Sequence, residues 1–383
     1  MSSKTEQLTD VSMSKKIFNW AAVAFFVYMV LVAVGTVSSG FKLFSGGTEG
    51  AKEIFEFATN PFIALLLGAL ATALVQSSST VTSVIVGLVA GGLPISIAIP
   101  MVMGANIGTT ITNTIVSIGH VRDKEEFKRA FSAATVHDFF NLLAVAIFLP
   151  LEIAFGFLQN VAQYLSHFFV GDTDMSIKSF NFIKPLTKPT VSFIKDTLDF
   201  IPGSNLGLAM VVVGIFIILV SVTSLGKVLR KVMVGRAKTI LHNAIGRGPV
   251  AGITSGTAVT IMVQSSSTTT SLMIPLAGSG VFTTKQIYPF TLGANIGTTI
   301  TALLAATSIS GAASEVALTI ALVHLLFNVF AVALIYGLPF LRDLPIKAAE
   351  KLAVVGTENK LLALLYVAGS FFIIPGLMVF LVK

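Results

Sequence analysis

The sequence predicts an all-α polytopic membrane protein with inverted-topology repeats, each containing a re-entrant helical hairpin and a broken helix. The 383 residues are 54% hydrophobic and 11% charged, with a mean hydropathy of +0.88. Soluble domains carry about 25% charged residues. Several apolar runs reach the roughly 20 residues that cross a bilayer as a helix. Two polar motifs also occur in the same order in both halves of the chain.

Charge and motif content argue against several function classes. The net charge of +7 is interpreted as the Lys and Arg excess of cytoplasmic loops, and not as a nucleic-acid surface. The chain has no cysteine, so disulfides and thiol chemistry are excluded. Neither HExxH nor GxSxG occurs, and no GxGxxG or GxxxxGK[ST] nucleotide loop is present. We therefore expect a protein that is not an enzyme and binds no nucleic acid.

The elements follow from the order of apolar and polar segments. Residues 1–17 are polar, and no cleavage site follows the first apolar run, which predicts a cytoplasmic tail before an uncleaved helix. The later boundaries place a first transmembrane helix with its extracellular connection at 18–58, repeat 1 at 59–158, an extracellular loop at 159–204, a linking helix with a basic cytoplasmic segment at 205–247, repeat 2 at 248–340, and a cytoplasmic loop with a final transmembrane helix at 341–383.

The apolar segments 60–91 and 249–280 each carry a polar QSSS insert at their middle. Each half is then about 15 residues long, which at 1.5 Å per residue is too short for about 30 Å of hydrocarbon. Two short helices that meet at a polar tip form a re-entrant hairpin. Such backbone is tolerated at membrane depth where protein buries it or where it lines a cavity.

Loop charges predict the orientation. Lys227 to Arg247 contains six basic residues and no acid, so it is expected in the cytoplasm, whereas 159–204 balances four Lys against four Asp. Seven spans and two hairpins then place the N-terminus in the cytoplasm and the C-terminus outside a cell membrane, inner or plasma. Three spans separate the hairpins, and this odd number predicts that they face opposite sides.

The internal repeat is exact over two motifs. VQSSST occurs at 75–80 and 263–268, and GANIGTTIT occurs at 104–112 and 293–301. HDFFN, which starts at His137, has a counterpart in HLLFN, which starts at His324. Inverted repeats with broken helices and a site at their interface are typical of secondary transporters. An anion channel or a membrane scaffold without transport activity stays open as an alternative.

Both motif zones lack charged side chains, so a site there must use hydroxyls, amides, backbone groups and helix ends. The carbonyl end of the first half-helix suits a small cation, and the N–H end of the second suits an anion. The alternative interpretation is that the Ser and Thr hydroxyls only bond to carbonyls of their own or a neighbouring helix. For His137 and His324, each with Asn at i+4, we favour hydrogen bonds between helices. Asp138 has no counterpart, because Leu325 stands at the matching position.

These motifs resemble the type II sodium-dependent phosphate cotransporters, whose hallmark is a pair of QSSS motifs, each followed by G-[AS]-N-I-G-T. The segment FKRAFSAATVHDFFN at 127–141 is also similar, and the resemblance covers about 60–350. The chain departs from animal members because the 159–204 loop is short and cysteine-free. The resemblance implies that the residues nearest phosphate are Ser77, Ser78, Ser265, Ser266, Asn106 and Asn295. It implies that the Na⁺ residues are Gln76, Gln264, Ser79, Ser267, Thr80, Thr268, Thr109, Thr110, Thr298 and Thr299.

The resemblance therefore implies sodium-coupled symport of inorganic phosphate into the cell by alternating access. Its partners are Na⁺, phosphate and the lipid bilayer, with no organic cofactor, and a homodimer stays open. Composition alone does not separate phosphate from another oxyanion such as sulfate or a dicarboxylate. The stoichiometry of Na⁺ to phosphate is also left open by the sequence.

Overall fold

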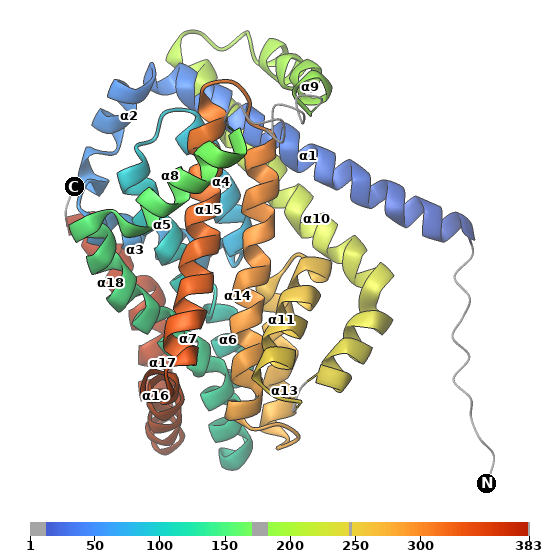
Figure 1. Cartoon of the computed structure of the whole chain (residues 1–383), viewed down its shortest axis with the longest axis vertical. Coiled ribbons are helices and arrows are strands. Elements are labelled where there is room, and N and C mark those ends of the chain that lie inside the picture. Colours follow the sequence, from blue (N-terminus) through green and yellow to red (C-terminus); the bar gives the residue numbers. More distant parts are fainter. Residues whose placement is uncertain (1–12, 171–182, 245–246, 382–383) are drawn as a thin grey trace.

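The computed structural model describes residues 13–170, 183–244 and 247–381, and nearly all of these residues are helical (Figure 1). Seven helices in this described part are long and apolar enough to cross a membrane, as predicted. They are Met13–Ser45, Ile95–Ile118, Lys124–Phe155, Ser204–Leu229, Thr284–Thr307, Ala313–Tyr336 and Lys360–Leu381. The prediction of an all-α polytopic membrane protein is confirmed.

The helices follow the order of the predicted repeats. The first half contains α1 (Met13–Ser45), α2 (Thr48–Ile54), η1 (Glu56–Ala58), α3 (Pro61–Val75), α4 (Ser78–Ala90), α5 (Ile95–Gly108), α6 (Ile111–Ile118), α7 (Lys124–Phe155), α8 (Phe157–Val170) and α9 (Ile183–Thr197). The second half contains α10 (Ser204–Ala244), α11 (Pro249–Val263), α12 (Ser266–Ser271), α13 (Met273–Gly278), α14 (Thr284–Thr307), α15 (Ala313–Ala331), η3 (Val332–Tyr336), α16 (Pro339–Glu358), α17 (Lys360–Ala368), η4 (Gly369–Ile373) and α18 (Ile374–Leu381).

Helix contacts extend the repeat beyond the sequence motifs. The helices that precede the two hairpins, α1 and α10, pack along each other on one side of the molecule (Figure 1). The helix that follows each repeat packs on the other repeat, because α8 packs on α15 while α16 packs on α7. Each hairpin packs on its own repeat through α3 with α5 and through α11 with α14. The main hydrophobic core lies where α4, α5, α7, α14 and α15 meet.

Two segments that the sequence analysis treats as loops are helical in part. The range 159–204 contains most of α8 and all of α9, and 341–360 contains most of α16. Of these helices, α8 and α16 carry a narrow buried apolar stripe that a search for long apolar runs does not detect. In α16, for example, Ile346, Ala349 and Ala353 are buried. Residues 1–12 of the predicted tail and 171–182 of the predicted loop lie outside the described residues.

The two predicted hairpins break where the motif predicts, after Val75 and after Val263. The second arm of the second hairpin also divides into α12 and α13 at Leu272. Pro275 explains this division, because proline has no N–H to give the carbonyl four residues earlier. That both arms enter and leave on one side of a membrane stays a prediction.

The prediction of a broken helix holds in repeat 1 and is wrong in repeat 2. Thr109 and Thr110 separate α5 from α6, whereas α14 runs through the same nine residues without interruption. The motif glycines serve close packing and not chain breaking. A Cβ on Gly104 would overlap the Leu65 carbonyl oxygen of α3, and one on Gly293 would overlap the Ile253 carbonyl oxygen of α11.

We expect Gly293→Ala to destabilise the fold by about 1–3 kcal/mol or more, because the added methyl group meets rigid backbone. Gly337→Ala is the matched control, since nothing lies within 4 Å of its Cβ position and its φ of −68° suits alanine. Thermal unfolding of the purified protein in detergent measures both. Equal melting temperatures for the two variants would contradict the packing role.

Candidate functional site

The two hairpin tips have the same backbone geometry. Gln76 and Gln264 adopt left-handed conformations, with φ of 56° and 53°, and are the non-glycine residues with positive φ in the described part of the chain. Their N–H groups bond to the carbonyls of Thr72 and Thr260, both at 2.7 Å, which ends α3 and α11. A left-handed residue other than glycine costs about 1–2 kcal/mol. Its occurrence at matching positions points to a function for the tip.

The serine after each glutamine begins the second arm. Ser77 and Ser265 are extended, and their Oγ atoms accept from the N–H groups of Thr80 and Thr268 at 3.2 Å. The remaining N–H groups at the start of α4 and α12 therefore point toward the tip, next to the carbonyls that end α3 and α11. One of these carbonyls, that of Ile261, accepts from Nε2 of Gln264. The predicted juxtaposition of a carbonyl end and an N–H end is present twice.

The other motif residues are mostly buried. Ser78, Ser79, Ser266 and Ser267 are 3–8% exposed, whereas Gln76 is exposed and Gln264 is half-buried. Four predicted Na⁺ residues bond to carbonyls of their own helix in this conformation, as the alternative interpretation of the sequence described. They are Thr109, Thr110, Thr298 and Thr299, with distances of 2.6–3.0 Å.

Asn106 and Asn295 join the two repeats through a buried network. Nδ2 of Asn295 donates to Oδ1 of Asn141 at 2.7 Å, and Oδ1 of Asn295 lies 2.7 Å from Nε2 of His137. Nδ2 of Asn106 donates to Oδ1 of Asn328 at 3.0 Å, and Oδ1 of Asn106 lies 3.2 Å from Nε2 of the second matched histidine. Each repeat therefore supplies a His and an Asn that bind the motif Asn of the other repeat.

The Asn side-chain amides determine which atoms donate and which accept hydrogen bonds in this network. Because each motif Asn donates through Nδ2, its Oδ1 is left to accept, so His137 and His324 donate through Nε2. Nδ1 of both histidines is buried without a partner. The structural role that the sequence analysis favoured for these histidines matches this arrangement. The role of Asn106 and Asn295 near phosphate stays a prediction.

Asn141 also explains the difference between the two GANIGTT segments. The N–H of Thr110 bonds to Ile107 at 3.4 Å, and Nδ2 of Asn141 donates at 2.7 Å to the Asn106 carbonyl at the helix break. In repeat 2, Nδ2 of Asn328 donates to the His324 carbonyl of its own helix, and α14 stays continuous. A side chain from α7 thus stabilises the break that α14 lacks.

The structure also gives Asp138 a partner and reveals two threonines that the sequence analysis missed. Asp138 accepts from the Tyr366 hydroxyl at 3.0 Å, which connects α7 to α17. Oγ1 of Thr72 and Oγ1 of Thr260, at matching positions four residues before the glutamines, are both buried without a partner. Alignment of the two repeats outside the identical motifs could have found these threonines, because they match in both copies.

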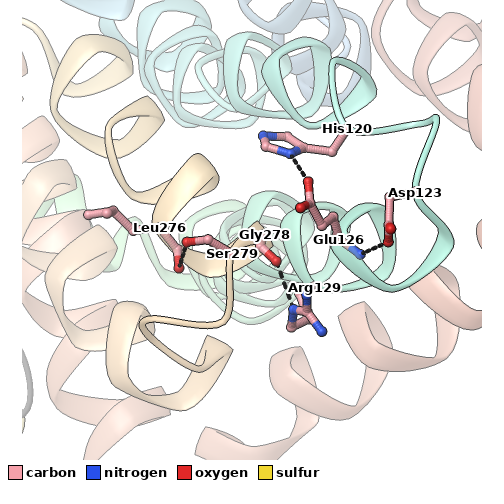
Figure 2. Close-up of polar contacts among 7 residues, drawn as sticks. All are labelled: His120, Asp123, Glu126, Arg129, Leu276, Gly278 and Ser279. Carbon is pink, nitrogen blue, oxygen red and sulfur yellow. Dashed lines mark hydrogen bonds and ion pairs between the residues drawn. The ribbon is translucent and has the colours of Figure 1, made fainter.

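Arg129 fixes the end of the second hairpin (Figure 2). Its Nε donates to the Gly278 carbonyl at 2.8 Å, which satisfies a carbonyl that α13 leaves open at its C-terminus. The start of α7 is held by Asp123, whose Oδ1 accepts from the Glu126 N–H at 2.9 Å, and Glu126 in turn contacts His120 at 3.2 Å. A neighbouring cavity of about 540 Å³ has two basic and two acidic residues and none of the predicted site residues in its lining.

The donors at the tips are neutral oxygens and N–H groups. Among the described residues, no group of three or more His, Asp or Glu side chains could hold a metal ion. Hydroxyl, amide and carbonyl oxygens remain, which are ligands suited to a hard cation. The exposed N–H groups at the start of α4 and α12 suit an oxyanion.

Comparison with known proteins shows the family of the chain. A family model described as Na⁺/Pi-cotransporter matches residues 29–171 and 217–340. The human sodium-dependent phosphate transport protein 2B is 33% identical over 439 residues, which cover 91% of this chain and 63% of that protein. The rat protein 2A is 32% identical over 421 residues, which cover 92% and 66%. The chain thus spans less than two thirds of these relatives. No solved structure matches it.

We expect Asn141→Ala to lower the melting temperature, because it removes the bonds from Asn141 to the Asn106 carbonyl and to Nδ2 of Asn295, at about 1–3 kcal/mol for each group left without a partner. Leu142→Ala, at the next residue of α7, removes a 41% exposed side chain and serves as the control. Thermal unfolding in detergent compares the two variants with the parent. A parental melting temperature for Asn141→Ala would show that the network does not hold the repeats together.

Proposed function

The chain belongs to the Na⁺/Pi-cotransporter family, and on that basis we propose that it carries inorganic phosphate into the cell together with Na⁺. The observation that supports this most directly is the matched pair of hairpin tips. Each tip presents a carbonyl end beside an N–H end, in a zone without charged side chains. An anion and Na⁺ bound side by side would each offset part of the other's cost of desolvation.

In this proposal the ligands divide between the two kinds of polar group. The serines at the start of α4 and α12, with Asn106 and Asn295, bind phosphate. The glutamines and the remaining Ser and Thr residues of the motifs bind Na⁺. Because Asn106 and Asn295 bond to His and Asn partners in this conformation, they would exchange those partners for phosphate. Such an exchange couples the substrate to the contact between the repeats.

The proposed cycle is alternating access. The hairpins enter from opposite sides of a cell membrane, with the N-terminus cytoplasmic and the C-terminus external, and the repeats move to expose the site first outside and then inside. Coupling requires that each ion raises the affinity for the other.

A tenfold Na⁺ gradient supplies about 1.4 kcal/mol per ion, and each net charge moved adds about 2.3 kcal/mol per 100 mV. Two Na⁺ per divalent phosphate would be electroneutral, and three electrogenic. The protein moves these ions without chemical change and without an organic cofactor.

We expect the purified protein in proteoliposomes to accumulate radiolabelled phosphate when Na⁺, but not choline, is outside. Gln76→Ala and Ser78→Ala should each reduce this uptake at least about tenfold, because a lost ligand to a desolvated ion costs about 1.5–3 kcal/mol. Thr254→Ala is the control, since this exposed side chain of α11 bonds only within its own helix.

Three results would contradict the proposal. Uptake that ignores Na⁺, or that equilibrates without accumulation, would indicate a channel. Competition by sulfate or a dicarboxylate at lower concentration than phosphate would assign another oxyanion. Parental uptake by both tip variants would place the site elsewhere.

A further inference from the structure

Each repeat carries a glutamine and a threonine at matching positions beyond a close contact between two helices. A Cβ on Gly108 would meet Thr72 at 2.8 Å, and one on Gly297 would meet Thr260 at 2.6 Å. Four residues further along the chain stand Gln76, which ends α3, and Thr112, which lies in α6 beyond the helix break. Gln264 and Thr301 stand at the same sequence positions in repeat 2, where α14 is continuous. The local sequence around both pairs is identical.

The pair in repeat 2 is joined. Oγ1 of Thr301 donates to Oε1 of Gln264 at 2.8 Å, and Nε2 of the same glutamine donates to the Ile261 carbonyl at 2.8 Å. Both polar atoms of the glutamine amide are thus bonded, and its side chain is half-buried. This contact fastens the tip of the second hairpin, at the end of α11, to α14.

The pair in repeat 1 is separated. Oγ1 of Thr112 is buried and has no hydrogen-bond partner, while Gln76 is exposed. A buried hydroxyl without a partner is unfavourable, so a conformation that returns the Gln76 amide to Thr112 would satisfy it. The backbone of the glutamines is not the obstacle, because both have nearly the same φ and ψ, and α5 approaches α3 as closely as α14 approaches α11. The two pairs differ at the threonine, because Thr112 follows the break between α5 and α6, whereas Thr301 lies within the continuous α14.

We propose that Gln76–Thr112 and Gln264–Thr301 are two equivalent latches that close alternately, one in each repeat, as the molecule changes conformation. The structure holds one latch closed and the other open, although the residues are the same. Thr112 and Thr301 are thereby positioning residues, which set the exposure of the glutamines and do not themselves bind the ions. This inference rests on the proposed alternating access, and it names the contacts that distinguish the two states.

The absence of cysteine in the natural chain makes the latch testable by cross-linking. Gln264→Cys with Thr301→Cys reports one latch, and Gln76→Cys with Thr112→Cys reports the other, each treated in proteoliposomes with a short bifunctional thiol reagent. We expect the two cross-linking yields to change in opposite directions when Na⁺ and phosphate replace choline and chloride. Yields that both rise or both fall would overturn the alternation. Because each pair replaces one proposed Na⁺ ligand, a yield that does not respond to the ions is decided by the second measurement, which needs no ion.

A second measurement separates a latch from a merely local contact. In the chain with Gln76→Cys and Thr112→Cys, Thr301→Val removes the opposite hydrogen bond while keeping the shape of the side chain. One neutral hydrogen bond corresponds to about a two- to tenfold change in the population of two states, so the repeat 1 yield should rise by that factor. Thr301→Ser, which keeps the hydroxyl, should leave the yield at the parental level.

Equal yields with Thr301→Val and Thr301→Ser would refute the coupling between the repeats. If Thr301→Val is not monodisperse in size-exclusion chromatography, Gln264→Leu removes the acceptor of the same bond and should give the same rise. The comparison of Thr301→Val with Thr301→Ser needs neither Na⁺ nor an anion. A raised repeat 1 yield in a protein that fails to accumulate phosphate would therefore support the latches while refuting the proposed substrate.

Discussion

Backbone groups without a partner inside a helix are the constraint on which the rest of this structure depends. In a membrane such groups have no water to bond with, so each must be satisfied by protein or reserved for a ligand. The chain satisfies several with side chains. Asn141 bonds to the carbonyl at the α5 break, and Arg129 bonds to the carbonyl that ends α13. The two hairpin tips are the exception. At each tip, the end of one half-helix and the start of the next are left facing each other around Gln76 or Gln264.

The same constraint explains why the repeats are interlocked. A helix end at membrane depth must be surrounded by other helices, and a single repeat has too few. Each repeat therefore receives helices from the other, as α8 packs on α15 and α16 packs on α7. The buried His and Asn side chains complete this exchange, because each motif Asn finds its partners in the opposite repeat. A displacement of one repeat must break hydrogen bonds made by the other, which gives the molecule a physical means of coupling its two halves.

Identical sequence does not give identical structure in the two copies. GANIGTTIT is interrupted in α5 and α6 but continuous in α14, and the matched glutamine is exposed in one copy and bonded in the other. The difference accompanies the choice of acceptor by the matched residues Asn141 and Asn328, of which the first bonds to the helix break and the second to its own helix. Two arrangements of one motif are thus both compatible with this chain, which is what an inverted repeat requires if its halves exchange conformations.

The sequence by itself determined the membrane class, the seven spans, the positions of both hairpin breaks and the repeat, because hydropathy and exact self-similarity are local signals. It also identified His137 and His324 as hydrogen-bonding groups between helices. It did not reveal that α8 and α16 are helices with a narrow buried stripe, or that Gly104 and Gly293 serve close packing. The buried threonines at 72, 112 and 260 were also missed. These features depend on which helix lies opposite each residue, and only the tertiary structure decides that, since the contacts join residues far apart in the chain.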